Sequence, residues 1–208
     1  MFQQKGEINA RETGWALRSL TALYTETGDE KWLQKCDWIV GHFVEWKEEF
    51  GAWLAPYTDH AVIRVPFMIS VAVGSLMRYY RIQPQAVIKE LIVSAMEDLL
   101  EDAQYADGLF YYKELPSLRH TSSTPIVLEA LAYAWELTGD KKFLEGGLAN
   151  LRAIIGRSND RIGGRGKKLL IEDAVVTMGS GTKEFSQAHG PVAAYTKALE
   201  TAGLLDRI

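Results

Sequence analysis

The densest group of chemically active side chains lies in one stretch, GAWLAPYTDHAVIRVP, which ends at position 66. Asp59 and His60 are adjacent, and a carboxylate beside an imidazole can accept and donate protons near neutral pH. Arg64 can bind a ligand carboxylate through two parallel hydrogen bonds. Trp53 and Tyr57 offer aromatic faces for a ligand ring. The structural alternative is that Asp59 caps a turn, His60 packs locally and Arg64 pairs with an acidic neighbour.

A second stretch, DGLFYYKELPSLRHTSSTP, carries similar residue types before another apolar segment. Tyr112 and His120 are candidates for proton transfer, and Arg119 is a candidate for anion binding. The Arg-His pair echoes His60 and Arg64 of the first stretch. The segment LFYYKEL also fits a short strand with alternating burial, in which the tyrosines are structural.

The N-terminal region adds Glu12 and Trp15, which open the first apolar helix. A carboxylate in the first turn stabilises a helix through its dipole, so Glu12 needs no chemical role. If it lies near Asp59, the two carboxylates can act as an acid and a base. Trp15 is a further face for ring stacking.

Metal and nucleotide sites find little support in the residue spacing. The four histidines are scattered, and Cys36 is the single cysteine. Cys36 falls on an apolar helix stripe, which predicts packing rather than nucleophilic chemistry. GGRGKK lacks both the leading Gly and the following Ser or Thr of a phosphate-binding loop. We therefore expect no cofactor and no zinc, while a calcium site made of loop oxygens stays open.

Composition bounds the class of protein. The chain has 208 residues, 47% of them hydrophobic, and a formal net charge of −4. An acidic balance disfavours nucleic-acid binding, which requires a basic surface. No apolar run approaches the length of a membrane span. The N-terminus lacks the apolar core of a signal peptide, so we expect a soluble cytoplasmic protein.

Two repeated turns organise the elements that carry these residues. Thr27-Gly28-Asp29 recurs 111 residues later as Thr138-Gly139-Asp140, and a weaker copy lies at an offset of 56. Gly can end a helix in the left-handed conformation, and Asp can cap the next one. We expect hairpins at about 12–47, 65–101 and 124–155, then a Gly-rich loop at 156–190 and a last helix at 191–205.

The helices of each hairpin differ in kind. VPFMISVAVGSLM and PIVLEALAYAWEL are apolar on nearly every face, whereas IKELIVSAMEDLLEDA has one apolar stripe. An all-apolar helix must be surrounded, and a striped helix faces solvent. The pattern predicts an all-α fold of antiparallel helical hairpins in two layers, about three and a half hairpins in one domain. We call the all-apolar helices inner and the striped helices outer. Each outer helix is followed by a long connection to the next inner helix, and the three long connections should gather at one end.

The stretches LTALYTETGDEKWL and LAYAWELTGDKKFL resemble those of the (α/α) toroids. They are most similar to the six-hairpin glycosidase group, which includes unsaturated glucuronyl hydrolases and related uronide-acting hydrolases and lyases. The resemblance covers about the first 155 residues as a pattern. A six-hairpin barrel needs about twice as many hairpins. The alternatives are a fragment of a longer chain, a short open solenoid, or half of a ring closed by self-association.

This resemblance implies hydrolysis or elimination of uronic-acid-containing oligosaccharides where the inner helices begin. The implied acid–base residues are Glu12, Asp59, His60, Tyr112 and His120. The implied substrate-binding residues are Trp15, Trp53 and Tyr57 for the sugar ring, and Arg64 and Arg119 for the carboxylate. The alternative is a non-catalytic helical-repeat scaffold that binds a protein or a glycan.

Overall fold

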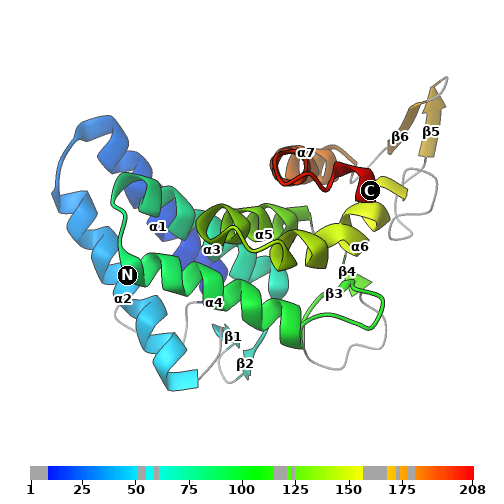
Figure 1. Ribbon diagram of the computed structural model, residues 1–208. Helices are drawn as coiled ribbons and strands as arrows, with labels where there is room; N and C mark the ends of the chain where they lie inside the picture. Colours follow the sequence, from blue (N-terminus) through cyan, green and yellow to red (C-terminus); the bar gives the residue numbers. More distant parts are fainter. Residues whose placement is uncertain are drawn as a thin grey trace.

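The computed structural model describes residues 9–50, 55–58, 61–114, 121–122, 125–156, 168–171, 174–177 and 181–208. This part of the chain is predominantly α-helical, as predicted, with three short antiparallel strand pairs (Figure 1). Its α-helices are α1 (Ala10–Thr27), α2 (Lys31–Phe50), α3 (Pro66–Ile82), α4 (Ala86–Asp102), α5 (Pro125–Thr138), α6 (Lys142–Gly156) and α7 (Gly181–Thr201). The strands are β1 (Ala55–Thr58), β2 (Ala61–Ile63), β3 (Phe110–Tyr111), β4 (Thr121–Ser122), β5 (Lys168–Ile171) and β6 (Ala174–Thr177).

Helices α1, α3, α5 and α7 pack side by side in chain order, and α2, α4 and α6 each pack on the helix that precedes them. Helix α3 is buried on almost every face, from Met68 to Met77 without interruption. Helix α4 instead buries a single stripe, made of Ile88, Leu91, Ile92, Ala95, Met96 and Leu99. The difference in burial follows the apolar patterns because only α3 has helices around it on most sides.

The first two inner helices approach each other very closely. A Cβ atom added at Gly14 of α1 would lie 2.8 Å from the Cα atom of Ala72 on α3. Two helix backbones come this near only where a side chain is missing. The contacts between the two helices follow the same direction in both, because Arg11 contacts Phe67 and, further along each helix, Arg18 contacts Gly74. Helices α1 and α3 are therefore parallel neighbours.

The turn between α1 and α2 has the predicted chemistry. Gly28 adopts φ 66°, and its N–H donates to the carbonyl of Tyr24 at 2.8 Å. Asp29 accepts a hydrogen bond from the backbone N–H of Lys31 at 3.0 Å, which caps the start of α2. The Thr27 hydroxyl donates to the carbonyl of Leu23 and accepts from the N–H of Asp29. Helix end, turn and helix start are thus joined by local bonds.

The turn between α5 and α6 repeats this arrangement bond for bond. Gly139 has φ 73°, and its N–H donates to the carbonyl of Trp135. Asp140 accepts from the N–H of Lys142 at 2.9 Å. The Thr138 hydroxyl again bonds the helix carbonyl four residues back and the N–H of Asp140. The sequence repeat is therefore a repeat of structure.

Two helix starts differ from the prediction. Proline is typical of a first helical turn, which predicts a helix start at Pro84, but helix α4 begins two residues later, at Ala86. Helix α7 begins at Gly181 and contains Pro191, which the sequence suggested as its first residue. Proline is favoured at the first position of a helix. Here it lies within a longer helix, which lacks one backbone hydrogen bond at that point.

The first two long connections meet beside the start of α3. The N–H of Glu114, after β3, donates to the carbonyl of Arg64, after β2, at 3.0 Å. Figure 1 shows β1 to β4 along the lower side of the helices, whereas β5 and β6 extend away at the upper right. The first two long connections thus lie together, as expected, whereas the strands of the third lie apart from them.

No helix within the described ranges is long and apolar enough to cross a membrane.

Candidate functional site

The start of α1 is organised by Asn9. Its side-chain oxygen accepts a hydrogen bond from the backbone N–H of Glu12 at 3.1 Å, and its carbonyl accepts from the backbone N–H and the hydroxyl of Thr13. This is the arrangement expected at a helix N-cap. Glu12 therefore stands in the first turn as the sequence predicts, with its carboxylate 3.4 Å from the guanidinium of Arg11 and half-exposed.

Trp15 is the exposed aromatic residue of this end of α1. It is 47% exposed, and the guanidinium of Arg11 lies 5.1 Å from the centre of its ring. The same guanidinium lies 5.7 Å from the ring of Phe67 at the start of α3. Cation–π contact holds the two aromatic residues and Arg11 together. The result is an aromatic platform across the first two inner helices, and Arg11 and Phe67 were not among the predicted site residues.

Arg64 is engaged by three carboxylates. Its guanidinium donates to Asp98 at 2.8 and 3.0 Å, to Asp102 at 2.9 Å and to Glu114 at 2.7 Å. The backbone N–H of Arg64 also donates to the Glu114 carboxylate at 2.9 Å. Its side chain is only 13% exposed. Arg64 therefore fixes two connections to α4, as the structural interpretation of this residue expects.

The electrostatic environment of Arg64 agrees with that role. Its hydrogen bonds to Asp98 and the three nearby negative charges raise its pKa still further, against the opposing effect of burial. A guanidinium whose donors are already bound to carboxylates offers little to a ligand carboxylate. The sequence could not identify these partners because Asp98, Asp102 and Glu114 are remote along the chain.

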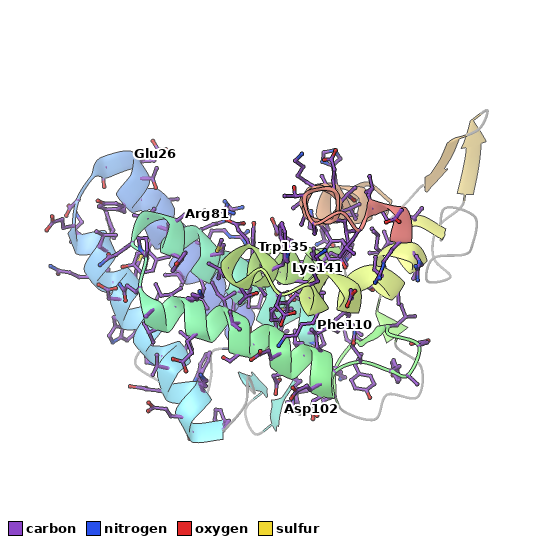
Figure 2. The ribbon with its side chains drawn as sticks, viewed as in Figure 1. Glu26, Arg81, Asp102, Phe110, Trp135 and Lys141 are labelled. Carbon is purple, nitrogen blue, oxygen red and sulfur yellow. The ribbon has the colours of Figure 1, made fainter. Side chains whose placement is uncertain are left out.

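Tyr112 lies just after β3 and is an exposed residue. Its neighbours in the chain are structural: Phe110 is fully buried, and Tyr111 makes an edge-on contact with Tyr105, with ring centres 4.2 Å apart. The short strand suggested by LFYYKEL is present as β3. Figure 2 shows Phe110 near Asp102, at the opposite end of the molecule from Glu26. Tyr112 thus belongs to the end where the long connections meet.

The remaining predicted residues are not placed. Trp53, Asp59, His60, Arg119 and His120 lie outside the described residues, and only the backbone of Tyr57 is described, within β1. Their roles stay predictions. Among the described residues, no group of three His, Cys, Asp or Glu side chains could hold a metal ion.

Two residues set aside by the sequence analysis behave as ordinary structural residues. Cys36 is fully buried in α2 beside Thr21, and burial raises the pKa of its thiol. A raised pKa keeps the thiol protonated and unreactive. His42, on the same helix, packs against the Trp38 ring with centres 4.4 Å apart.

A continuous surface runs along the inner helices, away from the outer layer. We call it the inner face, and its positions repeat at helical spacing on three helices. It comprises Arg11, Trp15 and Arg18 of α1, Phe67, Gly74, Arg78 and Arg81 of α3, and Glu129, Tyr133 and Glu136 of α5. Arg18, Gly74 and Glu129 stand at equivalent positions, at the repeat offsets of 56 and 111.

Charged groups occupy the middle of the inner face. The guanidinium of Arg18 extends toward α3, where its Nη2 atom would lie 3.4 Å from a Cβ atom added at Gly74. Burial lowers the pKa of Arg18, as does the positive charge of Arg78, while Glu129 and Tyr133 oppose the shift. The Nε–H of Arg18 is buried, and no described group accepts a hydrogen bond from it.

Tyr133 is a buried neighbour of the charged residues Glu129 and Arg81. Its hydroxyl donates to Glu129 at 2.8 Å, and the guanidinium of Arg81 lies 5.2 Å from its ring. Burial raises the pKa of Tyr133 to about 12, helped by the Glu129 charge and hydrogen bond. Arg81 is itself paired with Glu136 at 2.9 Å. The sequence analysis missed this cluster, although the repeat offsets place Arg18, Gly74 and Glu129 in one row.

Comparison with known proteins adds no further assignment: no family model matches the chain, and a search of curated proteins finds no significant match.

Proposed function

We propose that this chain is a carbohydrate-active enzyme, or part of the catalytic domain of one, and that it hydrolyses or eliminates uronic-acid-containing oligosaccharides. The observation that carries the proposal is the aromatic platform at the start of the inner helices. Trp15 presents a half-exposed ring there, with Arg11 across its face. Trp15 and Phe67 gather around Arg11 at this end, and a sugar ring can stack on an exposed aromatic face.

The arrangement of the helices supports an (α/α) toroid-like assembly. Inner helices pack in chain order, each followed by an outer helix, and two of the turns are identical in their bonding. In the proposal about three and a half hairpins form part of such an assembly. The platform lies at the end of α1 and α3 where the long connections enter, which is where toroid enzymes bind sugar.

In the proposal, the catalytic groups surround that platform. Glu12 is placed beside Arg11 at the start of α1. Asp59, His60, His120 and Tyr112 complete the acid–base set in the proposal, with one carboxylate as acid and another as base or nucleophile in hydrolysis. The uronate carboxylate would be held by an arginine other than Arg64, because Arg64 is bound to three carboxylates.

The binding test uses calorimetric titration with uronic-acid oligosaccharides and with neutral oligosaccharides. We expect Trp15→Ala to lower the affinity at least about tenfold, in line with the 1–3 kcal/mol typical of a stacked aromatic contact. The matched control is Trp38→Ala. Trp38 is also 47% exposed but lies on the outer helix α2, so its loss should leave glycan affinity unchanged.

Two results would count against the proposal. If neither class of oligosaccharide binds the wild-type protein, the platform does not recognise glycans, and the scaffold alternative gains support. Its exposed apolar residues on α1 and α2, such as Leu23 and Trp38, would then be the surfaces to test with protein partners. If both tryptophan variants lose affinity equally, the effect is not specific to the platform.

A turnover assay tests the catalytic part separately. Both reactions break the glycosidic bond and release a new reducing end, but only elimination also leaves a double bond conjugated to the carboxylate, which absorbs ultraviolet light. We expect Asp59→Asn and His60→Gln to reduce turnover at least about a hundredfold, as loss of an acid–base group does. Undiminished turnover in both variants would remove Asp59 and His60 from the mechanism.

A further inference from the structure

The arginine at the centre of the inner face has one donor without an acceptor. Arg18 is partly buried, and its Nε–H is enclosed without an acceptor among the described groups. An enclosed donor without an acceptor costs free energy, and the cost is greater when the group is charged. Such a donor is a candidate for a hydrogen bond to a water, an ion or a ligand.

Gly74 allows the guanidinium of Arg18 to lie over the backbone of α3. It occupies the position on α3 equivalent to Arg18 on α1 and Glu129 on α5, so the middle helix contributes no side chain to this row. The Arg18 guanidinium reaches over that position, with Nη2 3.4 Å from where a Cβ atom would stand. A side chain at position 74 would contact the guanidinium. In this row the Arg18 side chain is therefore the group that lies over Gly74.

The charges around Arg18 favour an anion. Arg78 is close enough to Arg18 to repel it, and an anion between two guanidinium groups relieves that repulsion while accepting their hydrogen bonds. Glu129 is the nearby acid, and one of its oxygens accepts from the Tyr133 hydroxyl while its charge partly offsets that of Arg18. Arg81, one turn further along α3, is already paired with Glu136. Arg18 and Arg78 are thus the two neighbouring cations of the inner face for which no ion pair is described.

We propose that Arg18, whose guanidinium lies over Gly74, and Arg78 together bind the carboxylate of a uronic acid on the inner face. The proposal deepens the proposed function, because it rests on the sugar ligand and assigns the recognition of its acid group. Arg18 lies on the same stripe of α1 as Trp15, one turn toward the Thr-Gly-Asp turn. A sugar stacked on Trp15 can therefore direct a carboxylate toward Arg18.

The test follows the arginine itself by nuclear magnetic resonance. The protein is labelled with nitrogen-15, and the Nε–H signal of Arg18 is identified by its absence in Arg18→Gln. Wild-type protein is then titrated with glucuronate and, separately, with glucose, which lacks the carboxylate. We expect a saturable shift of the Arg18 signal with glucuronate and none with glucose. Arg18→Gln should weaken glucuronate binding about tenfold or more, the loss of a charged hydrogen bond.

Two variants separate a local site from general charge. Gly74→Ala keeps every charge, favours the helix and places a methyl group against the guanidinium. It should weaken glucuronate binding about fivefold, or roughly 1 kcal/mol. Arg81→Gln removes the same charge as Arg18→Gln from the same face, but from an arginine held by Glu136. It should change the affinity less than about twofold.

The proposal is overturned if glucuronate leaves the Arg18 signal unmoved, or if Arg18→Gln and Arg81→Gln weaken binding equally. Its failure differs from failure of the proposed function. If uronic-acid oligosaccharides bind in a Trp15-dependent manner but do not shift Arg18, the function stands and this site is wrong. If glucuronate shifts Arg18 while no oligosaccharide depends on Trp15, the acid site stands and the oligosaccharide proposal is wrong.

Discussion

Arg64 bonds to the outer helix α4, Arg18 lies between the inner helices α1 and α3, and the two have opposite surroundings. Arg64, just before α3, is 13% exposed and donates to Asp98, Asp102 and Glu114. Arg18, in the middle of α1, encloses an Nε–H without an acceptor among the described groups. The surroundings raise the pKa of Arg64 and lower that of Arg18.

The comparison separates an arginine that holds the fold from one that is available to a ligand. An arginine whose donors are all bound gains little from a further anion, and its removal leaves carboxylates without a counter-charge. An arginine that is partly buried and unpaired gains from an anion, and its removal relieves a cost. The family resemblance implied Arg64 as a carboxylate-binding residue, whereas the contacts agree with its structural interpretation and point instead to Arg18.

The largest expected effect comes from Arg64→Gln. This change leaves Asp98, which is 12% exposed, without a counter-charge beside two further carboxylates. We expect the free energy of unfolding to fall by about 3 kcal/mol, as when one partner of a buried ion pair is removed. Urea denaturation measures the change. Arg64→Lys retains the charge but loses the parallel hydrogen bonds, and it should recover part of the loss. A loss below about 1 kcal/mol would show that Arg64 is not structural.

The carboxylates around Arg64 should differ in importance. Asp98 is 12% exposed and receives two bonds from Arg64, while Asp102 is 56% exposed and receives one. Asp98→Asn should cost about 2 kcal/mol, the value of hydrogen bonds to a charged group. Asp102→Asn should cost about 0.5 kcal/mol or less, since exposed pairs contribute little. Equal losses, measured by the same urea titration, would show that burial does not set the strength of the cluster.

On the Arg18 side, Tyr133 gives a pH-dependent test. The pKa of Tyr133 is raised from its ordinary 10.0 to about 12, so above pH 10 the folded protein keeps a proton that the unfolded chain loses. The stability from this difference is present below pH 10 and is lost as the pH rises to about 12. Between pH 9 and pH 11, wild-type protein should lose about 1 kcal/mol more than Tyr133→Phe. Parallel losses in urea titrations would mean that Tyr133 titrates normally.

The smallest expected effect is that of Arg18→Gln on stability. Removing an unpaired, partly buried cation should leave the free energy of unfolding within about 0.5 kcal/mol of wild type, or raise it slightly. The contrast with Arg64→Gln, on the same urea scale, is the direct check of the comparison. A loss as large as that of Arg64→Gln would show that Arg18 has a structural partner, and the inner-face site would lose its basis.

The helical character, the alternation of apolar and striped helices and the two Thr-Gly-Asp turns could be predicted because each is a local property. Gly28 and Gly139 adopt the left-handed conformation, and Asp29 and Asp140 cap the next helix, within a few residues of each other. Such a short segment contains all the residues that determine its hydrophobic periodicity or its turn conformation. The toroid-like assembly and the number of hairpins stay predictions.

The candidate site was less predictable because its contacts join distant segments. Nothing near Arg64 in the sequence identifies Asp98 or Glu114 as its partners. Pro191 fitted a helix start as well as a helix interior, and only packing distinguishes the two. Arg18 was overlooked because it lies within a helix rather than a long connection. The repeat offset that aligns it with Gly74 was visible, but its meaning depends on two helices being neighbours.

The contact between Gly14 and Ala72 has a consequence for the thermodynamics of binding. Because no side chain separates the two backbones at this point, α1 and α3 are packed in direct contact and their relative movement is restricted. Trp15, Arg18 and Gly74 should therefore keep fixed positions relative to one another. A ligand that spans the two helices meets a surface ordered in advance, so little conformational entropy is lost when it binds.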